Sequence, residues 1–502
     1  MSKTPNGNGN GHNVAALAQK PAPLKPVAPT VAPTLEAKEN CVGFRTAEDG
    51  ELRGALTHFT RQSATFELYG ETGALRMSEM LADFRINVRG QTIYSGPAVV
   101  SNLADNVSRI ICEVNLDKTQ WLADADLLSS LRSEGGVEKE FDKFEREWQK
   151  FYIVSPEFKV AVADMQSFFC DLQLWLNQVE IGLHAYPPAE RGKLELDFLN
   201  ESSGRTMRSF TSLFERFEKL ASATEPASRP SHSLYAKRLL HPLVLCAPFM
   251  HRTYKKPLGY AGDYEMVRMM TLDAFQGNSL FSKLLNKFFL NTPPVVAHRN
   301  RIDTLVRYLE SESLRFPHKN KRAKIFNLGC GPAAEIQRFL KHSNRSDQCD
   351  FTLLDFNDET VAFAQRTLNQ MRDQNGRRTG IDVLKKSVTQ LIKNSAQFKP
   401  GSYDLVYCAG LFDYLSDNVS TMLLEIFYEL AAPGGLVLVS NVDASNPSRG
   451  WMECVVDWHL IYRNAAQMHD LIPRQIARDS IHVFAELSSV NIFAEIRKPE
   501  NA

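Results

Sequence analysis

The sequence predicts an α/β protein whose C-terminal half is a parallel sheet wound by helices. Two observations carry this prediction. Residues 324–333, Lys-Ile-Phe-Asn-Leu-Gly-Cys-Gly-Pro-Ala, read as an apolar strand, a glycine turn and the start of a helix. Further short apolar runs follow at the intervals expected of strands that alternate with helices. In open sheets of this kind a nucleotide-like ligand binds at the carboxyl ends of the strands.

The composition is that of an ordinary globular protein and narrows the possible functions. Of the 502 residues, 43% are apolar and 23% are charged, and 58 basic residues balance 58 acidic ones. This balance argues against a nucleic-acid partner. No run of 18 apolar residues occurs, so we expect no membrane span. The eight cysteines lack metal-ligand or disulfide-framework spacing, so we expect no metal and a reducing, cytoplasmic location.

The glycine turn is the candidate cofactor site. Gly329 and Gly331 tolerate positive φ and let a ligand approach the backbone closely. The helix that starts at about Ala334 offers unpaired N–H groups behind the turn. No Lys-Ser/Thr pair follows, which excludes a P-loop, and the third glycine of the dinucleotide fingerprint would fall at Ala334. The turn alone therefore leaves the identity of the nucleotide open.

The strands downstream of the turn strengthen the prediction of an adenosine-binding sheet. Residues 350–355, Asp-Phe-Thr-Leu-Leu-Asp, read as a buried strand that ends in a carboxylate about 25 residues beyond the turn. A carboxylate at that place can accept hydrogen bonds from both ribose hydroxyls. Later strands are expected at residues 381–387, 403–410, 432–440, 480–485 and 491–497.

Residues 328–333 followed by Glu335 resemble motif I of the class I S-adenosylmethionine-dependent methyltransferases. Asn327 and Ala333 depart from that motif, where the family usually has an acidic residue and a glycine. The resemblance implies a Rossmann-like domain with a seven-stranded sheet, closed by the last two strands as an antiparallel pair. It also implies S-adenosyl-L-methionine as the cofactor.

The same resemblance implies a set of cofactor contacts. Gly329, Cys330 and Gly331 are expected to line the methionine moiety, and Asp355 is expected to hold the ribose. The turn after the fourth strand should face the reactive methyl group. The full expected set is Tyr260, Asn327, Gly329, Cys330, Gly331, Asp355, Phe356, Ser387, Val388, Cys408, Ala409 and Gly410.

A second segment is expected to carry specificity. Residues 254–264, Tyr-Lys-Lys-Pro-Leu-Gly-Tyr-Ala-Gly-Asp-Tyr, combine glycines and tyrosines as a binding lid would. With residues 458–463, Trp-His-Leu-Ile-Tyr-Arg, they resemble a bacterial methyltransferase group named for the biosynthesis of extracellular factor, or 3-hydroxypalmitic acid methyl ester. That similarity covers residues 235–497 and implies a small-molecule acceptor, with esterification of a (3-hydroxy) fatty acid as its reaction.

Two acceptor chemistries remain open from the residues themselves. A fatty carboxylate is already ionised at neutral pH and needs only a cation to hold it. The candidate cations are Arg299, Arg301 and Arg463. A hydroxyl or amine of a secondary metabolite would instead need a general base. The candidate bases are Asp263, His298 and His459.

The N-terminal part predicts a tail and a small barrel. Residues 1–40 are rich in Asn, Gly, Pro and Ala and are expected to be disordered. Residues 41–117 alternate apolar and polar positions in short stretches, which is typical of an antiparallel barrel. The order of the strands and turns resembles that of PilZ domains, which bind cyclic di-GMP. Neither binding signature of that family is intact here. The barrel is therefore expected either to bind cyclic di-GMP or to form a homodimer contact. A further alternative is that the whole protein is a regulator without catalytic activity.

Residues 118–290 are expected to be a helical region that acts as a lid on a methyltransferase domain at residues 291–502. Residues 141, 144, 148 and 151 repeat apolar side chains at the spacing of one helix face. Residues 165–183 and 210–220 repeat that pattern. All three stripes are expected to pack in a core.

Overall fold

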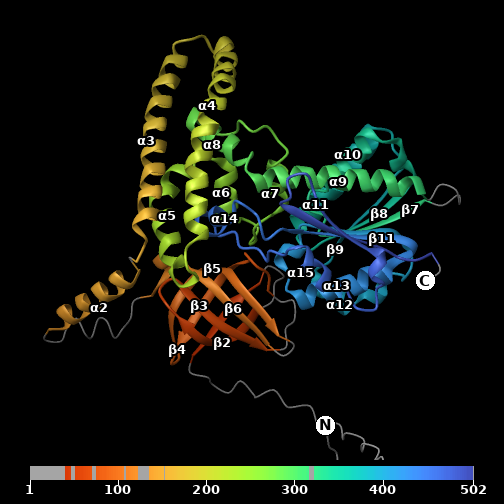
Figure 1. The fold of residues 1–502 in the computed structure, drawn as a ribbon, viewed down its shortest axis with the longest axis horizontal. Coiled ribbons are helices and arrows are strands. Elements are labelled where there is room, and N and C mark those ends of the chain that lie inside the picture. Colours follow the sequence, from red (N-terminus) through yellow and green to blue (C-terminus); the bar gives the residue numbers. More distant parts are fainter. Residues whose placement is uncertain are drawn as a thin grey trace, which may run out of the picture. The chain divides into compact units, whose positions relative to one another are not determined.

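The fold is described from a computed structural model (Figure 1). The structure describes residues 40–46, 51–69, 75–106, 109–122, 135–151, 153–315 and 322–500. The expected disordered tail lies outside these residues except for Asn40. Residues 39–502 group into one unit that contains every described element.

The first described strands close into a six-stranded antiparallel barrel, which confirms the predicted barrel. The strands are β1 (Asn40–Arg45), β2 (Glu51–Phe59), β3 (Ser63–Tyr69), β4 (Met80–Val88), β5 (Gln91–Asn106) and β6 (Arg109–Leu116). Their order is β1-β2-β3-β6-β5-β4, and β1 pairs again with β4 to close the ring. Alternate residues such as Phe44, Phe66 and Phe84 point inward and form the barrel core. A short 3-10 turn, η1 (Lys118–Gln120), follows.

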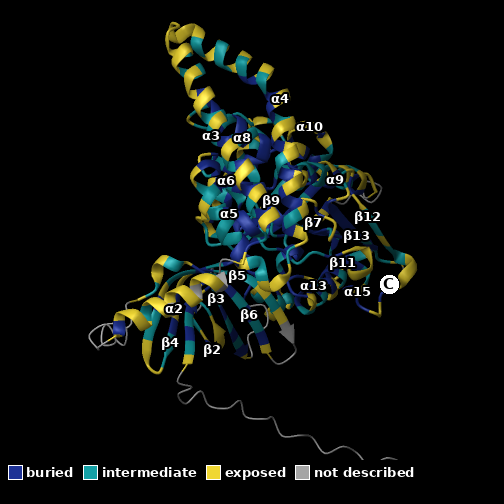
Figure 2. Ribbon diagram, turned by 60° about the vertical axis from the view of Figure 1, so that its left-hand side comes forward, coloured by how far each residue is buried: buried dark blue, intermediate teal, exposed yellow. Residues whose placement is uncertain are grey.

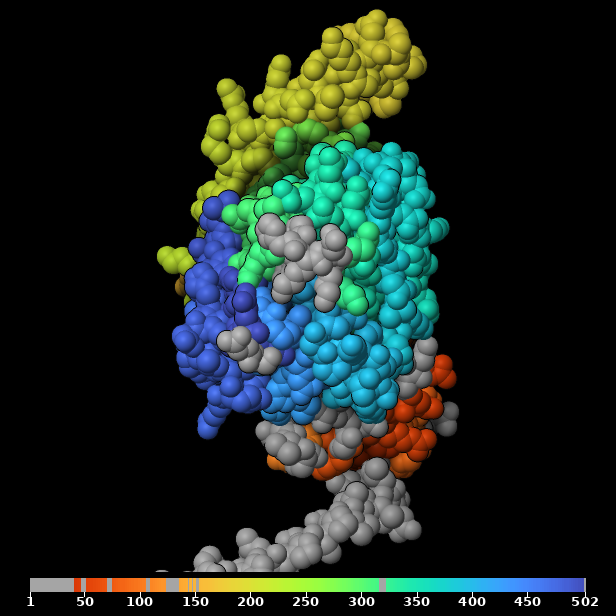
Figure 3. Space-filling view, turned by 90° about the vertical axis from the view of Figure 1, so that its right-hand side faces the viewer, coloured from red at the N-terminus to blue at the C-terminus, as the bar shows by residue number. Residues whose placement is uncertain are grey.

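Helices fill most of the chain between the barrel and the sheet. They are α2 (Gly136–Phe151), α3 (Pro156–His184), α4 (Pro188–Ser222), η2 (Pro226–Ser228), α5 (Arg229–Val244), α6 (Pro248–Lys255), α7 (Tyr264–Met269), α8 (Leu280–Phe289) and α9 (Pro293–Arg315). Their shared core includes Phe158, Phe169, Phe210 and Phe217, as the stripes in α3 and α4 predict. The tip of the α3–α4 hairpin (yellow) projects beyond the residues of α9 to α11 in the space-filling view (Figure 3).

The apolar stripe of α2 does not follow the prediction. Phe141, Phe144 and Trp148 are 58%, 55% and 48% exposed. Exposed positions of α2 are drawn yellow in Figure 2. The spacing correctly predicts an amphipathic helix, but periodicity alone does not say what lies against its apolar face.

The C-terminal half is a seven-stranded sheet with the order β12-β13-β11-β10-β7-β8-β9. The strands are β7 (Ala323–Leu328), β8 (Cys349–Asp355), β9 (Gly380–Lys385), β10 (Tyr403–Ala409), β11 (Ala431–Val442), β12 (Ile481–Ala485) and β13 (Asn491–Arg497). Strand β13 runs antiparallel to both of its neighbours, whereas β7 to β11 pair in parallel. The sheet confirms the predicted Rossmann-like methyltransferase fold and its antiparallel closing pair.

Helices cover both faces of the sheet (Figure 1). On one face α9, α10 (Ala334–His342) and α11 (Asp358–Gln374) contribute to one apolar core. The other face carries α12 (Val388–Lys393), α13 (Asp417–Leu430) and α15 (Ala465–Asp470), which share a second core. The remaining elements are η4 (Asn344–Gln348), η5 (Ser395–Gln397), η6 (Phe412–Tyr414), α14 (Arg449–Val456) and η7 (Arg478–Ser480). Within the described residues, no helix is both long enough and apolar enough to cross a bilayer.

Candidate cofactor and acceptor pocket

A pocket lies at the carboxyl ends of β7, β8 and β10, where the sheet type predicts a ligand site. It holds roughly 1050 Å³ of space, its open mouth included. Its walls come from the glycine turn, the ends of β8 and β10, helix α9, the loop before α7 and, unexpectedly, the barrel.

The glycine turn has the backbone shape that its sequence predicts. Gly329 and Gly331 adopt φ values of 73° and 51°. Ala333 is also left-handed, with φ 52° and ψ 46°, and caps the N-terminus of α10 without a side-chain hydrogen bond. Left-handed backbone is strained for alanine. This conformation explains why the family motif usually has glycine at the place of Ala333.

Asp355 ties the end of β8 to the glycine turn. Its Oδ2 accepts a hydrogen bond from the Gly331 N–H at 3.1 Å, and its Oδ1 accepts one from the Asn357 N–H at 3.1 Å. Burial raises the pKa of the Asp355 carboxyl, and these backbone N–H groups work in the opposite direction. The carboxylate lines the pocket, in reach of a ribose.

Two aromatic rings stand beside Asp355 at the same end of the pocket. The rings of Tyr260 and Phe356 lie 5.0 Å apart at an angle of 54°. Burial raises the pKa of the Tyr260 phenol, so this group stays neutral. With Val388 in the wall as well, this end is apolar and aromatic and suits an adenine ring.

Asn327 supplies an unpaired acceptor at the other end of the glycine turn. Its Nδ2 donates to the backbone oxygen of Tyr407 at 3.2 Å, while its Oδ1 is buried with no partner among the described residues. A buried polar atom without a partner is costly unless a ligand completes it. An ammonium group such as that of a methionine moiety would do so. These features fit the S-adenosylmethionine that the resemblance implies.

Arg301 brings a positive charge into the pocket beside the end of β10. Its Nη2 lies 2.7 Å from Nδ1 of His298, and a Cβ added to Gly410 would stand 2.6 Å from the same Nη2. Burial lowers the pKa of Arg301, but a guanidinium remains charged at neutral pH. A side chain at position 410 would therefore require the Arg301 guanidinium to move.

His298 is a hydrogen-bond donor in this arrangement. Arginine can only donate, so Nδ1 of His298 must accept and the ring proton must sit on Nε2. Burial, followed by the charges of Arg301 and Arg299, lowers the pKa of His298 well below its ordinary value, which keeps the ring neutral. Nε2 is buried and has no partner among the described residues.

The barrel contributes Arg76 and Met77 to the pocket wall. The guanidinium carbon of Arg76 lies 4.2 Å from the centre of the Phe356 ring, at the end of the pocket that holds Asp355. Nothing in the residues around Arg76 predicts this position, because a contact between residues 280 positions apart leaves no local pattern.

Most of the expected cofactor contacts come together at this one pocket. The expected residues that line it are Tyr260, His298, Asn327, Gly329, Cys330, Gly331, Asp355, Phe356, Val388, Ala409 and Gly410. Arg301, one of the three candidate cations, also lines it.

Two expected cofactor contacts point elsewhere. Cys408 is fully buried in the core on the opposite face of the sheet, because side chains alternate along β10. Its neighbour Tyr407 faces the pocket instead and donates from its hydroxyl to Oε1 of Glu335 at 2.7 Å. Ser387 is the N-cap of α12 and forms a capping box with Gln390. The period of two in the strand could have identified Tyr407.

Three candidate catalytic residues lie outside the pocket wall. Asp263 is buried as the N-cap of α7 and forms an ion pair with Arg252 at 2.9 Å. His459 lies in a separate polar network, with Nε2 3.4 Å from Nδ2 of Asn115. Both positions correct the expectation that these groups face the acceptor.

Arg463 is also outside the pocket wall, and its side chain is buried and hydrogen-bonded within the fold. It is 1% exposed and donates to the backbone oxygens of Phe412 and Leu415 and to the side chains of Asp417 and Asn441. These bonds use its whole guanidinium, so none is left for a substrate carboxylate.

Arg299 also forms hydrogen bonds within the fold and does not face the pocket. Its guanidinium donates to the backbone oxygens of Met270 and Leu290 at 3.1 and 2.8 Å, and it does not line the pocket. Of the three candidate cations, Arg301 is therefore the one that faces the pocket. No group of three or more His, Cys, Asp or Glu residues in the described part of the chain could hold a metal ion.

Comparison with known proteins gives one family match. Residues 326–437 match a family model described as a methyltransferase domain. An uncharacterized protein of Rickettsia prowazekii (strain Madrid E) is 22% identical over 135 residues, which are 27% of this chain and 47% of that protein. The chain thus spans about half the length of this curated relative.

Solved structures with a similar chain trace share little sequence with the protein. A possible exported protein from Bordetella parapertussis is 16% identical with a TM-score of 0.38, over 60% of this chain and 97% of that one. Magnesium protoporphyrin IX methyltransferase from Synechocystis PCC 6803, with bound SAH, is 14% identical with a TM-score of 0.34 and covers 50% of this chain and 98% of its own.

Proposed function

We propose that the protein transfers a methyl group from S-adenosylmethionine to the carboxylate of a small apolar acid, with a 3-hydroxy fatty acid as the first candidate. The methyltransferase domain matched at residues 326–437 uses S-adenosylmethionine as its cofactor. When bound, this cofactor supplies an electrophilic methyl group on a sulfonium. The side chains of the pocket then have to hold the acceptor, exclude water and keep the acceptor ionised.

The pair formed by Arg301 and His298 carries the proposal. Arg301 presents a guanidinium whose only hydrogen bond among the described residues goes to Nδ1 of His298, and His298 presents a buried Nε2–H without a partner. Both groups are donors, and a carboxylate is an acceptor with two oxygens. The pair is therefore complementary to an ionised acid.

The same hydrogen bond disfavours the alternative chemistry. A hydroxyl or amine acceptor needs a group that takes up a proton, and of the three candidate bases Asp263, His298 and His459, His298 alone is among the described residues that line the pocket. Its one basic nitrogen is occupied by Arg301, and its pKa is lowered by burial and by that neighbouring charge. An acceptor that is already ionised requires no such base.

The apolar part of the pocket wall suits an apolar substituent on the acid. Val267, Ile302 and Leu411 line the same pocket as Arg301 and offer side chains without hydrogen-bonding groups. Burial of each methylene of an acyl chain there would contribute about 0.8 kcal/mol. All eight cysteines are unpaired, which supports the further proposal that the protein works in the reducing cytoplasm.

A transfer assay with S-adenosylmethionine labelled in its methyl group tests the proposal. The purified protein is given 3-hydroxy and unsubstituted fatty acids of several chain lengths, and a parallel set of amines and phenols. We expect label in the acids only, and release of that label as methanol after mild alkali, because esters hydrolyse there. Alkali-stable label, or transfer to amines or phenols alone, would contradict an ester product.

A further inference from the structure

A short segment of the barrel, residues 75–79, immediately precedes β4 and contacts the catalytic half. All five side chains are buried. The Met77 N–H donates to the backbone oxygen of Tyr414 at 3.2 Å, and the Met80 N–H donates to that of Gly259 at 2.7 Å. Glu79 and Tyr260 form an isolated antiparallel bridge. The segment therefore pairs, backbone to backbone, with two loops of the pocket.

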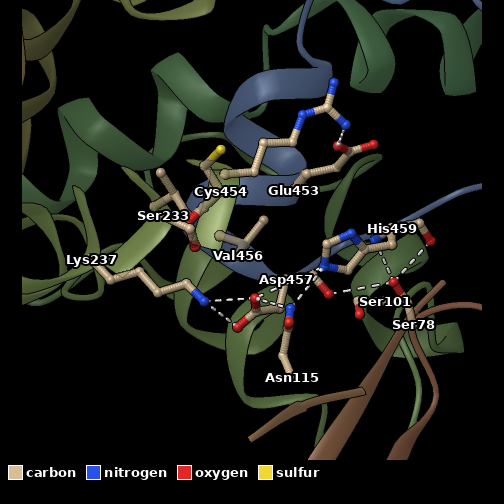
Figure 4. A network of polar contacts seen from close by, with 12 residues as sticks. Ser78, Ser101, Asn115, Ser233, Lys237, Glu453, Cys454, Val456, Asp457 and His459 are labelled. Carbon is tan, nitrogen blue, oxygen red and sulfur yellow. Dashed lines mark hydrogen bonds and ion pairs between the residues drawn. The ribbon is translucent and has the colours of Figure 1, made fainter. Parts of the chain in front are cut away.

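A polar network holds the segment in place (Figure 4). The Ser78 hydroxyl donates to the backbone oxygen of His459 at 2.9 Å, and Asn115 of β6 contacts Asp457 and His459. Lys237 of α5 binds both carboxylate oxygens of Asp457 at 2.6 Å. Barrel, helices and the segment after α14 thus meet at a single buried cluster.

This anchoring fixes the position of Arg76. The side chain is 8% exposed, lies over the Phe356 ring and lines the pocket. Asp355 precedes Phe356 in the chain and the Tyr260 ring packs on Phe356, and the positive charge of Arg76 opposes the rise of the pKa of both Asp355 and Tyr260. It is the only cation from the barrel that lines this pocket among the described residues.

We propose that the barrel forms part of the cofactor site, in which Arg76 holds the adenosine end of S-adenosylmethionine against Phe356. A flat guanidinium on an aromatic ring offers both a stacking surface and hydrogen-bond donors. This inference rests on the proposed cofactor site and assigns part of that site to the N-terminal domain.

Calorimetric titration with S-adenosylhomocysteine tests this role in the full chain. We expect Arg76→Met to weaken binding by about tenfold or more, because it removes the charge and the planar donor group. Arg85→Met, at an exposed ion pair with Glu51 on the barrel surface, is the matched control and should bind like the wild type. Asp355→Ala provides the reference for a lost ribose contact, also at least about tenfold.

The pH dependence of binding separates an electrostatic role from a structural one. The groups that face Asp355 are Arg76, Tyr260, Cys330 and the backbone N–H groups already described. Affinity should fall on acidification as Asp355 takes up a proton, and Arg76→Met should move this fall to higher pH. Arg76→Lys keeps the charge and should leave the midpoint near that of the wild type. This comparison remains decisive if the Met variant does not fold.

The outcomes are distinguishable. Equal affinities of the wild type and Arg76→Met would overturn the role of the barrel while leaving the cofactor site intact. The role of the barrel would also be overturned if the pH midpoint of binding in Arg76→Lys were higher than that of the wild type. Absence of any binding by the wild type would instead refute the proposed function itself.

Discussion

At the scale of single residues, Arg301 is the group on which acceptor recognition depends. Arg301→Met removes the charge but keeps much of the apolar stem. We expect KM for acid acceptors to rise by about tenfold or more, because a charge-assisted pair of hydrogen bonds is lost. Affinity for S-adenosylhomocysteine should change little. Steady-state kinetics and calorimetry check the two expectations separately.

Arg307→Met is the matched control for that experiment. Arg307 lies on the same helix, is exposed and donates to Thr304 at 3.0 Å. It should leave both constants at their wild-type values. A parallel loss of acceptor and cofactor affinity in Arg301→Met would contradict a role confined to the acceptor.

The buried position of Lys256 predicts that its contribution to the stability of the fold depends on pH in the alkaline range. It is 1% exposed, its Nζ donates to the backbone oxygen of Val456 at 3.0 Å, and burial lowers its pKa to about 8. The unfolded chain keeps the ordinary value of 10.5. Between these values the unfolded state binds more protons, so the contribution of Lys256 to stability increases as the pH rises.

Thermal unfolding of Lys256→Met at several pH values checks this sign. The free energy of unfolding of the methionine variant, relative to that of the wild type, should be highest near pH 7.5. This difference should decrease towards pH 10, by at most about 1.4 kcal/mol per pH unit. Lys255→Met, at the exposed neighbouring position, should show no such trend. A constant difference across the range would mean that the amine titrates normally.

The sequence predicts the pocket residues of the glycine turn and the β8 carboxylate because their chemistry and spacing are local. Gly329, Gly331 and Asp355 all lie where the pattern places them. The prediction also places Arg463 and His459 there, because they lie in the resembling segment 458–463 and have suitable residue types. Burial and hydrogen bonding decide such cases, and neither is visible in the sequence.

At the scale of elements, the junction between α14, α5 and the barrel predicts a strong response to one substitution. Burial alone would raise the pKa of Asp457, but Lys237 overrides it and holds the pKa well below its ordinary range. Lys237→Met would remove the ammonium group that binds both oxygens of the buried Asp457 carboxylate, at a cost of about 3 kcal/mol. The apparent melting temperature should fall by several degrees.

Two further variants make that result interpretable. Asp457 adopts left-handed backbone with φ 50°, which asparagine tolerates well. The double variant Lys237→Met with Asp457→Asn should therefore recover much of the loss. Lys385→Met, at an exposed pair with Asp358, should cost little. If it destabilises as much as Lys237→Met, burial is not the cause.

The sequence predicts the type of the secondary-structure elements better than it predicts which parts of the chain pack against them. Alternation in residues 41–117 and the apolar runs after residue 324 correspond to the barrel and the sheet, because period and length distinguish strands locally. The amphipathic pattern of residues 141–151 also predicts a helix, which is α2, yet the apolar side chains of this helix are exposed. Which surface covers a helix depends on tertiary contacts that periodicity does not encode.

At the scale of the whole molecule, the shared pocket predicts that ligand binding is felt in the barrel. A ligand that binds only the folded state stabilises the elements that form its site. S-adenosylhomocysteine should therefore slow amide exchange in residues 75–80 and in β4 as well as in the glycine turn. Hydrogen-exchange mass spectrometry measures this directly. Protection limited to the sheet would show that the barrel is energetically independent.

The backbone hydrogen bonds of residues 75–79 also constrain the order in which the chain can assemble. The barrel leaves the ribosome first, but Ser78 finds its partner His459 only after 381 further positions have been made. Such distant contacts form late in folding. The buried side chains of this segment lack their partners in the nascent chain until residue 459 has been made, so the pocket wall to which they belong can be completed only after the segment that follows α14 has been synthesised.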